Sequence, residues 1–190
     1  ISEYSNGAYT GETSVEMLND LNIKWTIIGH SERRQFFSET NQVIQNKLKQ
    51  TVENNINPIL CIGETLSDRE SGNTLKVLKE QTQIACDSND FSNVNLVIAY
   101  EPVWAIGTGV AAELETILET HGQIRDFLPE IISNSDNISI LYGGSVNPNN
   151  CKKILDINNV DGFLIGGASL DPQKFLNIYT QMNEIGVESL

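Results

Sequence analysis

Five short apolar runs, spread along the chain, place the strongest limit on the folds open to this sequence. The runs cover 25–28, 58–62, 96–100, 138–141 and 162–165. They are rich in β-branched or aromatic residues, and they lack the alternation of polar and apolar positions that a strand with one face in water shows. Such runs are typical of parallel strands buried on both faces, so we expect five strands of this kind.

Stretches with the apolar spacing of helices separate these runs. The expected helices cover 14–18, 43–52, 75–84, 114–128, 150–155 and 172–182. Pro129 is expected to end the fourth of them, and Asp171 with Pro172 to begin the last. Alternating strands and helices indicate an α/β protein with a parallel sheet. The strand spacing, roughly 25 to 45 residues, suits the βα units of a barrel or a doubly wound sheet. No linker interrupts the series, so we expect one domain.

Composition excludes several classes of partner. The formal net charge of -13 argues against nucleic acid and anionic membrane surfaces, because both would repel the chain. The apolar runs are also far too short to span a bilayer. The cysteines, Cys61, Cys86 and Cys151, are widely spaced, and the histidines are only His30 and His121. We therefore expect no metal site, no disulfide framework, and reduced thiols in the cytoplasm.

Candidate catalytic residues are sought where strands end, because parallel α/β folds carry their sites at the carboxyl ends of the strands. His30 follows the first run and precedes Ser31 and Glu32, which mark a helix start. The positive end of a helix dipole disfavours an imidazolium, which leaves a neutral ring able to donate a hydrogen bond. A histidine that only caps or packs is the alternative, and position alone favours it.

Glu101 ends the third run and precedes Pro102. A carboxylate at the mouth of an apolar strand is a candidate general base, because desolvation raises its basicity. A solvated loop glutamate fits the position equally well. The apolar, glycine-containing segment 102–109 that follows is consistent with a lid that excludes water, or with a partly buried connector.

Two glycine pairs close the last two strands, at Gly143-Gly144 and Gly166-Gly167. Glycine permits close approach of the backbone, and amides at a helix start bind phosphate. Paired loops of this kind on consecutive strands match the phosphate site of many (β/α)8 enzymes. Neither pair has the spacing of a dinucleotide fingerprint or a P-loop, which disfavours nucleotide binding.

Taken together, six segments resemble triosephosphate isomerases. They are 7–12, 28–34, 61–64, 99–109, 142–146 and 161–170, and they follow the family's order from end to end of the chain. The resemblance implies a TIM (β/α)8 barrel, present over 1–190 as a single partial domain with five of eight parallel strands. It also implies interconversion of dihydroxyacetone phosphate and D-glyceraldehyde 3-phosphate, a step of glycolysis and gluconeogenesis, through an enediolate and without cofactor or metal.

The resemblance also assigns roles to residues, and these roles come from the family rather than from the spacing. Glu101 matches the base, His30 the neutral imidazole that polarises the carbonyl, and Glu32 a further carboxylate of the site. Phosphate contacts are expected from Gly107, Ser145, Gly166 and Gly167, and roles in lining the site or holding the lid from Ser31, Trp104 and Tyr142.

Further matches are structural. Cys61 matches a buried packing cysteine, and Arg125 with Asp161 a structural salt bridge. The loop around Thr10 resembles the one that inserts into a neighbouring subunit, which implies a homodimer.

The sequence departs from the family's pattern in two places. The lid tip carries Val110-Ala111-Ala112 where a lysine and a threonine are usual, which puts the lid kinetics in doubt. The chain opens on Ile1 with 190 residues, whereas a (β/α)8 barrel takes about 250. The family's first strands, with an asparagine and a lysine of the site, are therefore expected to be absent. We expect little isomerase activity from these residues alone. The alternative is a catalytically incompetent fragment that binds a phosphorylated ligand or assembles with a complementary chain.

Overall fold

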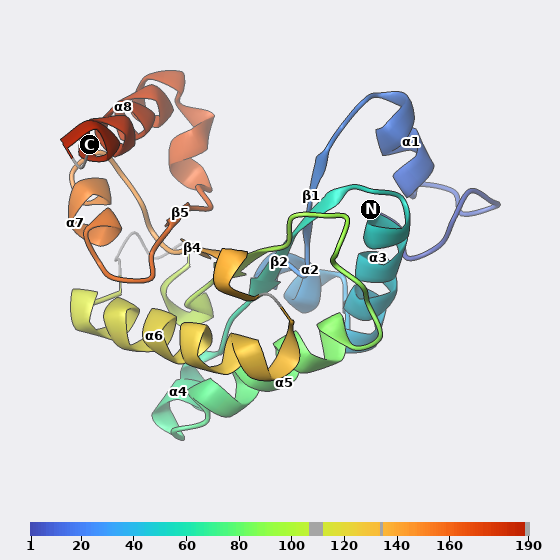
Figure 1. The fold of residues 1–190 in the computed structure, drawn as a ribbon, viewed down its shortest axis with the longest axis horizontal. Helices are drawn as coiled ribbons and strands as arrows, with labels where there is room; N and C mark the ends of the chain where they lie inside the picture. Colours follow the sequence, from blue (N-terminus) through green and yellow to red (C-terminus); the bar gives the residue numbers. More distant parts are fainter. Residues whose placement is uncertain (107–111, 134, 189–190) are drawn as a thin grey trace.

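A five-stranded parallel sheet organises the computed structural model, which describes residues 1–106, 112–133 and 135–188. Its strands are β1 (Trp25–Ile28), β2 (Asn57–Ile62), β3 (Val97–Tyr100), β4 (Ser139–Tyr142) and β5 (Gly162–Phe163). Each strand pairs with its neighbours in sequence, in the order β1-β2-β3-β4-β5. Figure 1 follows this order from β1 on the right to β5 on the left. The predicted α/β fold with five parallel strands is confirmed, and the strand order is that of consecutive βα units.

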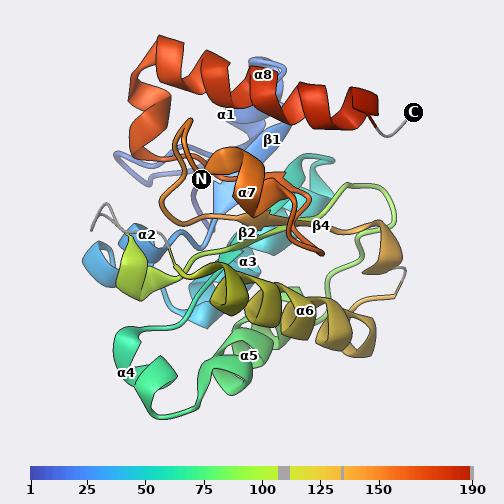
Figure 2. The same ribbon diagram turned by 90° about the vertical axis from the view of Figure 1, so that its left-hand side faces the viewer.

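Helices alternate with the strands as expected. The α-helices of the described residues are α1 (Val15–Asp20), α2 (Ser31–Phe36), α3 (Asn41–Glu53), α4 (Leu66–Glu70), α5 (Thr74–Cys86), α6 (Leu114–Ile131), α7 (Cys151–Leu155) and α8 (Pro172–Glu188). Short 3-10 helices cover η1 (Val103–Ala105), η2 (Ser135–Asn137) and η3 (Gly167–Leu170). In both views α5 and α6 lie beneath the sheet (Figures 1 and 2), and in Figure 1 α1 lies toward the β1 end and α8 toward the β5 end. None of the described helices is long and apolar enough to cross a membrane.

Local hydrogen bonds explain where several helices start. The side chains of Ser14 and Thr40 accept from amides in the first turns of α1 and α3. Thr65 and Asp68 form a reciprocal capping box, which satisfies free N–H groups at the start of α4, a helix that the sequence analysis did not anticipate. The backbone amides of Gln173 and Lys174 donate to the Asp171 carboxylate, so the predicted start of α8 is also present.

The predicted end of α6 at Pro129 is wrong, because the helix continues to Ile131 with the proline inside it. A proline within a helix removes its own N–H but not the donors that follow it. The Ile132 amide still donates to the Leu128 carbonyl over 2.9 Å, and the buried Ile132 side chain anchors this end of the helix. The predicted end of the fifth strand at 165 is also late. β5 ends at Phe163, where its partner β4 ends at Tyr142.

The core lies between the sheet and the helices α3, α5 and α6. Fully buried side chains from each layer meet there, among them Leu48, Leu78, Ile98, Ile124 and Ile140. This apolar contact fixes the sheet against its helices and so fixes the carboxyl ends of the strands relative to one another.

The prediction that every strand is buried on both faces is wrong for β1. Trp25 is 44% exposed and Ile27 45%, whereas Ile28 on the other face is buried. Ile28 packs into the core with Ile44 and Leu48 of α3, so Trp25 and Ile27 lie on the face of β1 that points away from this helix, where they stay half exposed. An apolar face of this kind is what an incomplete barrel section presents.

His121 in α6 is a buried histidine outside the predicted site. Its Nδ1 lies 2.9 Å from the Asn159 carbonyl oxygen, which can only accept, so Nδ1 carries the proton. Its Nε2 has no hydrogen-bond partner among the described atoms, and the ring packs edge-on against Tyr100. Burial lowers the pKa of His121 from 6.5 to about 4.

This lowered pKa predicts loss of stability in mild acid. Between pH 6.5 and about 4 the unfolded chain binds a proton at His121 that the folded chain does not. The free energy of unfolding should therefore decrease as the pH is lowered through that range, by about 1.4 kcal/mol per pH unit and about 3 kcal/mol in all. Urea titrations at pH 7.0, 6.0 and 5.0 measure the slope. The His121→Gln variant should show a smaller slope, and equal slopes in both chains would contradict the prediction.

Candidate active site

The candidate base and the candidate histidine meet at the carboxyl ends of the strands. Glu101 follows β3, and His30 follows β1 as the N-cap residue of α2. The His30 Nε2 lies 3.0 Å from the Glu101 Oε1. Ser31 donates twice to the same carboxylate, from its hydroxyl to Oε1 over 3.2 Å and from its backbone amide to Oε2 over 2.9 Å. Three residues that the sequence analysis singled out separately thus form one hydrogen-bonded group.

The protonation state of His30 follows from its two neighbours. Its Nδ1 accepts a hydrogen bond from the Glu32 backbone amide over 3.3 Å, so this nitrogen carries no proton. The ring is then neutral with its proton on Nε2, which donates to the Glu101 carboxylate. His30 is a helix cap and a partner of Glu101 at once, so the two interpretations of its position are compatible.

Glu101 is buried, with 2% of its surface exposed, so the alternative of a solvated loop glutamate is wrong. Burial raises the pKa of the Glu101 carboxyl above its usual range, while His30 and the two hydrogen bonds from Ser31 offset part of that rise. Burial also raises the pKa of the Cys61 thiol, and the nearby Glu101 carboxylate adds to the effect. Cys61 is therefore an uncharged packing residue, as expected.

Gly63 leaves room for the backbone that carries Glu101. The Glu101 amide donates to the Ile62 carbonyl at the end of β2 over 2.8 Å. A Cβ atom on Gly63 would lie 2.0 Å from the Glu101 carbonyl oxygen. The close approach of the two strand ends therefore requires glycine at this position.

A second buried carboxylate, Glu64, is a residue for which the sequence analysis assigned no role. Its Oε1 accepts from the Tyr100 hydroxyl over 3.1 Å, from the Trp104 indole over 2.9 Å and from Arg69 over 3.0 Å. The Arg69 guanidinium also lies over the Trp104 ring, 5.2 Å from its centroid. Glu64 follows a strand end as Glu101 does, and that shared position was the signal available in the sequence.

The other predicted site residues make no recorded contact with the Glu101 side chain among the described residues. The Tyr142 hydroxyl accepts from the Ala112 amide over 3.3 Å, at the end of the segment expected to be a lid. Ser145 is half-buried, while Gly166 and Gly167 are exposed at the start of η3. The Glu32 side chain is exposed, and only its backbone contacts His30. No contact recorded among the described residues joins Ser145 or the two glycines to Glu101.

Gly107, Val110 and Ala111 lie outside the described residues. The expected salt bridge is present, with Arg125 2.8 Å from Asp161. No group of three or more His, Cys, Asp or Glu side chains within 1–106, 112–133 and 135–188 is arranged to hold a metal ion.

Comparison with known proteins agrees with this geometry. A sequence model of the family described as triosephosphate isomerase matches residues 1–182. The triosephosphate isomerase of Francisella philomiragia is 46% identical over 190 residues, which are 99% of this chain and 75% of that protein. The enzyme of Francisella tularensis subsp. mediasiatica is 47% identical with the same coverage.

A relative from another organism gives the same result. The triosephosphate isomerase of Vesicomyosocius okutanii is 46% identical over 175 residues, which are 91% of this chain and 71% of that protein. The match runs across the strands, the contact between Glu101 and His30, and the glycine loops alike. On the strength of both fold and sequence, this chain belongs to the triosephosphate isomerase family.

Proposed function

We propose that this protein interconverts dihydroxyacetone phosphate and D-glyceraldehyde 3-phosphate, with Glu101 as the base and His30 as the hydrogen-bond donor to the substrate oxygens. The observation that carries the proposal is the buried Glu101 carboxylate, which lies 3.0 Å from the Nε2 of a neutral imidazole. Membership of the family supplies the substrate, a triose phosphate.

The reaction moves two protons within the substrate, from C1 to C2 and from O1 to O2, and changes no net oxidation state. Glu101 takes a proton from C1 of the ketose, and the electrons of that bond form an enediolate whose O2 accepts from the His30 Nε2–H. His30 gives this proton to O2 and takes the proton of the O1 hydroxyl, which moves the negative charge to O1. Glu101 then returns its proton to C2 while the charge on O1 forms the C1 carbonyl, and the aldose results. A desolvated carboxylate is a stronger base than one in water, which favours the first step. A neutral imidazole suits the transfer of protons to and from the enediolate oxygens, because its acid strength is closer to that of an enediol than the acid strength of an imidazolium is.

Substrate binding must first free the base. The described hydrogen bonds engage both oxygens of Glu101, through His30 and Ser31. A substrate carbonyl oxygen that takes over the Nε2–H of His30 removes one of these contacts. Ser31 therefore lines the site as a holder of the base, which fits its expected position. Glu32 remains a proposed carboxylate of the site, and its backbone amide, which donates to the His30 Nδ1, holds the neutral ring in place.

Phosphate binding is proposed for the amides of Gly107, Gly166 and Gly167 together with Ser145. Amides at the start of a helical turn attract anions without a positive side chain, which suits a chain of net charge -13. Trp104, tied to Glu64, and Tyr142, which accepts from Ala112, flank the proposed lid on its two sides. We propose no cofactor and no metal for this reaction.

Residues 1–190 are proposed as one partial barrel domain, and the protein is proposed to act in the cytoplasm. A homodimer through the loop around Thr10 is also proposed. Thr10 is exposed there, and Tyr4 and Tyr9 stack at 4.4 Å, which gives the loop a rigid aromatic base for contact with a partner.

The test compares two proteins in a coupled isomerase assay. One is the 190-residue chain alone, and the other is this chain joined to the part of the Francisella philomiragia enzyme that it does not cover. We expect little turnover from the chain alone and at least about a hundredfold more from the joined protein, since catalytic groups must be held in place to act. A joined protein that folds and has no activity would instead support the catalytically incompetent fragment that binds phosphorylated ligands or a complementary chain.

A further inference from the structure

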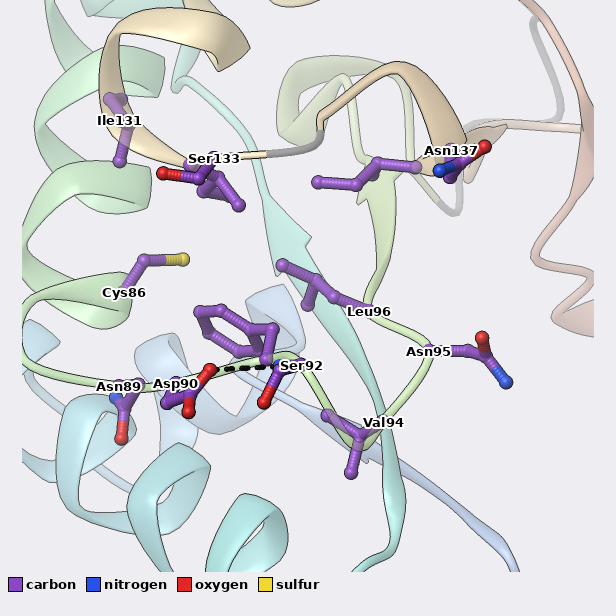
Figure 3. Close-up of a pocket in the computed structure, with 13 residues that line it drawn as sticks. Cys86, Asn89, Asp90, Ser92, Val94, Asn95, Leu96, Ile131, Ser133 and Asn137 are labelled. Carbon is purple, nitrogen blue, oxygen red and sulfur yellow. Dashed lines mark hydrogen bonds between the residues drawn. The ribbon is translucent and has the colours of Figure 1, made fainter.

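A cavity of about 520 Å³ lies at the end of the sheet opposite Glu101. It is bounded by the ends of α5 and α6 and by the segments that lead into β3 and β4 (Figure 3). Leu96 and Ile138, which line it, immediately precede those two strands, whereas Glu101 follows β3. The cavity is therefore separate from the candidate active site, and its size falls within the range of small-ligand sites.

The walls combine an apolar interior with a polar rim. Leu96, Ile132 and Ile138 are buried apolar residues of the lining, and Phe91 contributes an aromatic ring. The polar residues Asn89, Ser92, Asn95, Ser133 and Asn137 also line the cavity (Figure 3), and the Asn89 side-chain amide donates to the Ala85 carbonyl at the end of α5. Such walls suit a ligand with a flat apolar body and one polar group, because the body displaces water while the rim supplies hydrogen bonds.

The charged side chain that lines the cavity is acidic. Among the described lining residues, the exposed Asp90 carries a carboxylate and none is Lys, Arg or His. The Ser92 backbone amide donates to the Asp90 Oδ1 over 2.9 Å. This hydrogen bond and a second one from the Ser92 side chain lower the pKa of the Asp90 carboxyl. Burial raises the pKa of Cys86 to about 12, so this thiol adds no charge and no competing nucleophile near neutral pH.

Two helix dipoles add to the negative potential. The 13-residue α5 and the 18-residue α6 both end at the cavity, and neither has a basic residue in its last turn. Each carboxyl end carries roughly half a negative elementary charge. The nearby cation Arg125 donates to the Ile138 carbonyl and pairs with Asp161, while Lys79 pairs with Glu130 between the two helices. These positive charges are therefore already balanced.

We propose that this cavity binds a small organic cation, an ammonium or amidinium group on a flat apolar body. The body lies among the apolar residues of the interior, and the cation lies between the Asp90 carboxylate and the carboxyl ends of α5 and α6. The Phe91 ring offers a further favourable surface for the positive charge. The site is independent of the isomerase reaction, because it shares no residue with it.

The test uses three probes of nearly the same shape: benzamidinium, neutral benzamide and benzoate. Calorimetric titration of the 190-residue chain should give a Kd for benzamidinium at least about fivefold below that for benzamide, with no binding of benzoate, because a charge-assisted contact adds to the same apolar burial. Raising the salt concentration should narrow this gap, since ions screen exposed charges.

Two variants locate the site. Asp90→Asn keeps an oxygen that can accept from the Ser92 amide but removes the charge, so it should bring benzamidinium to the level of benzamide. Glu70→Gln removes a charge from exposed α4, which begins beyond the carboxyl end of β2, and should leave the preference intact. Methyl NMR signals of Leu96 and Ile138 should shift on titration while those of Ile28 do not. Equal binding of benzoate, or an unchanged preference in Asp90→Asn, would overturn the proposal.

Discussion

Glu101→Gln should lower isomerase turnover by about three orders of magnitude in the joined protein, in which the Francisella philomiragia enzyme supplies the part that this chain does not cover. Glutamine keeps the size of the side chain, and its one oxygen can still accept a hydrogen bond from Ser31, but it cannot take the proton from C1. A positioned general base contributes roughly 10²- to 10⁴-fold to such a reaction, which sets the expected loss. Steady-state assays in both directions measure it.

The control for this variant separates chemistry from folding. Burial disfavours the charged form of Glu101, so the neutral amide should not lower the urea midpoint of unfolding. Glu70→Gln makes the same chemical change on an exposed surface and should keep full turnover. The assignment of Glu101 as the base would be refuted by a folded Gln variant that keeps more than a tenth of the turnover.

Gly63→Ala should damage stability and activity together. The added Cβ would lie 2.0 Å from the Glu101 carbonyl oxygen and 3.0 Å from its carbonyl carbon. Both are backbone atoms and cannot rotate away, so the ends of β2 and β3 must separate. Overpacking of this kind costs about 3 kcal/mol of unfolding free energy. A shift of about 1 Å at Glu101 would also lower turnover by about 10²-fold.

A glycine elsewhere in the chain provides the matched control. A Cβ on Gly122, within α6, meets no heavy atom within 4 Å. Gly122→Ala should therefore raise the unfolding free energy by up to about 1 kcal/mol, because alanine favours the helix. Urea titrations and assays of both variants decide the outcome. If Gly63→Ala were as stable and active as Gly122→Ala, the close approach at Glu101 would not limit the site.

The sequence predicts the sheet well because parallel strands need continuous apolar runs, and each expected run forms a strand. The sequence predicts burial and helix ends less well, because these depend on contacts with other elements. The composition of β1 resembles that of a fully buried strand, yet burial depends on a covering layer that the described residues do not supply. Pro129 is a strong local stop signal that the tertiary contact of Ile132 overrides.

The site shows the same division. Strand ends identify His30 and Glu101 as candidates, but their contact crosses β2 and depends on the register of three strands. Ser31 as a double donor to Glu101 requires side-chain geometry that no spacing rule contains. Glu64 was overlooked because its three donors come from separate elements, and only the fold brings them to one oxygen.

Because Trp25 lies on the exposed face of β1, the protein's own tryptophan fluorescence can report on changes at that face. The chain has two tryptophans, of which Trp25 is 44% exposed and Trp104 is partly buried beside Glu64. Emission from an indole shifts to shorter wavelength when water leaves it. A chain segment that covers β1 would move the Trp25 spectrum, whereas motion of the lid would act on Trp104. With one tryptophan replaced by phenylalanine at a time, assembly of the barrel and movement of its lid can be followed as two separate optical signals.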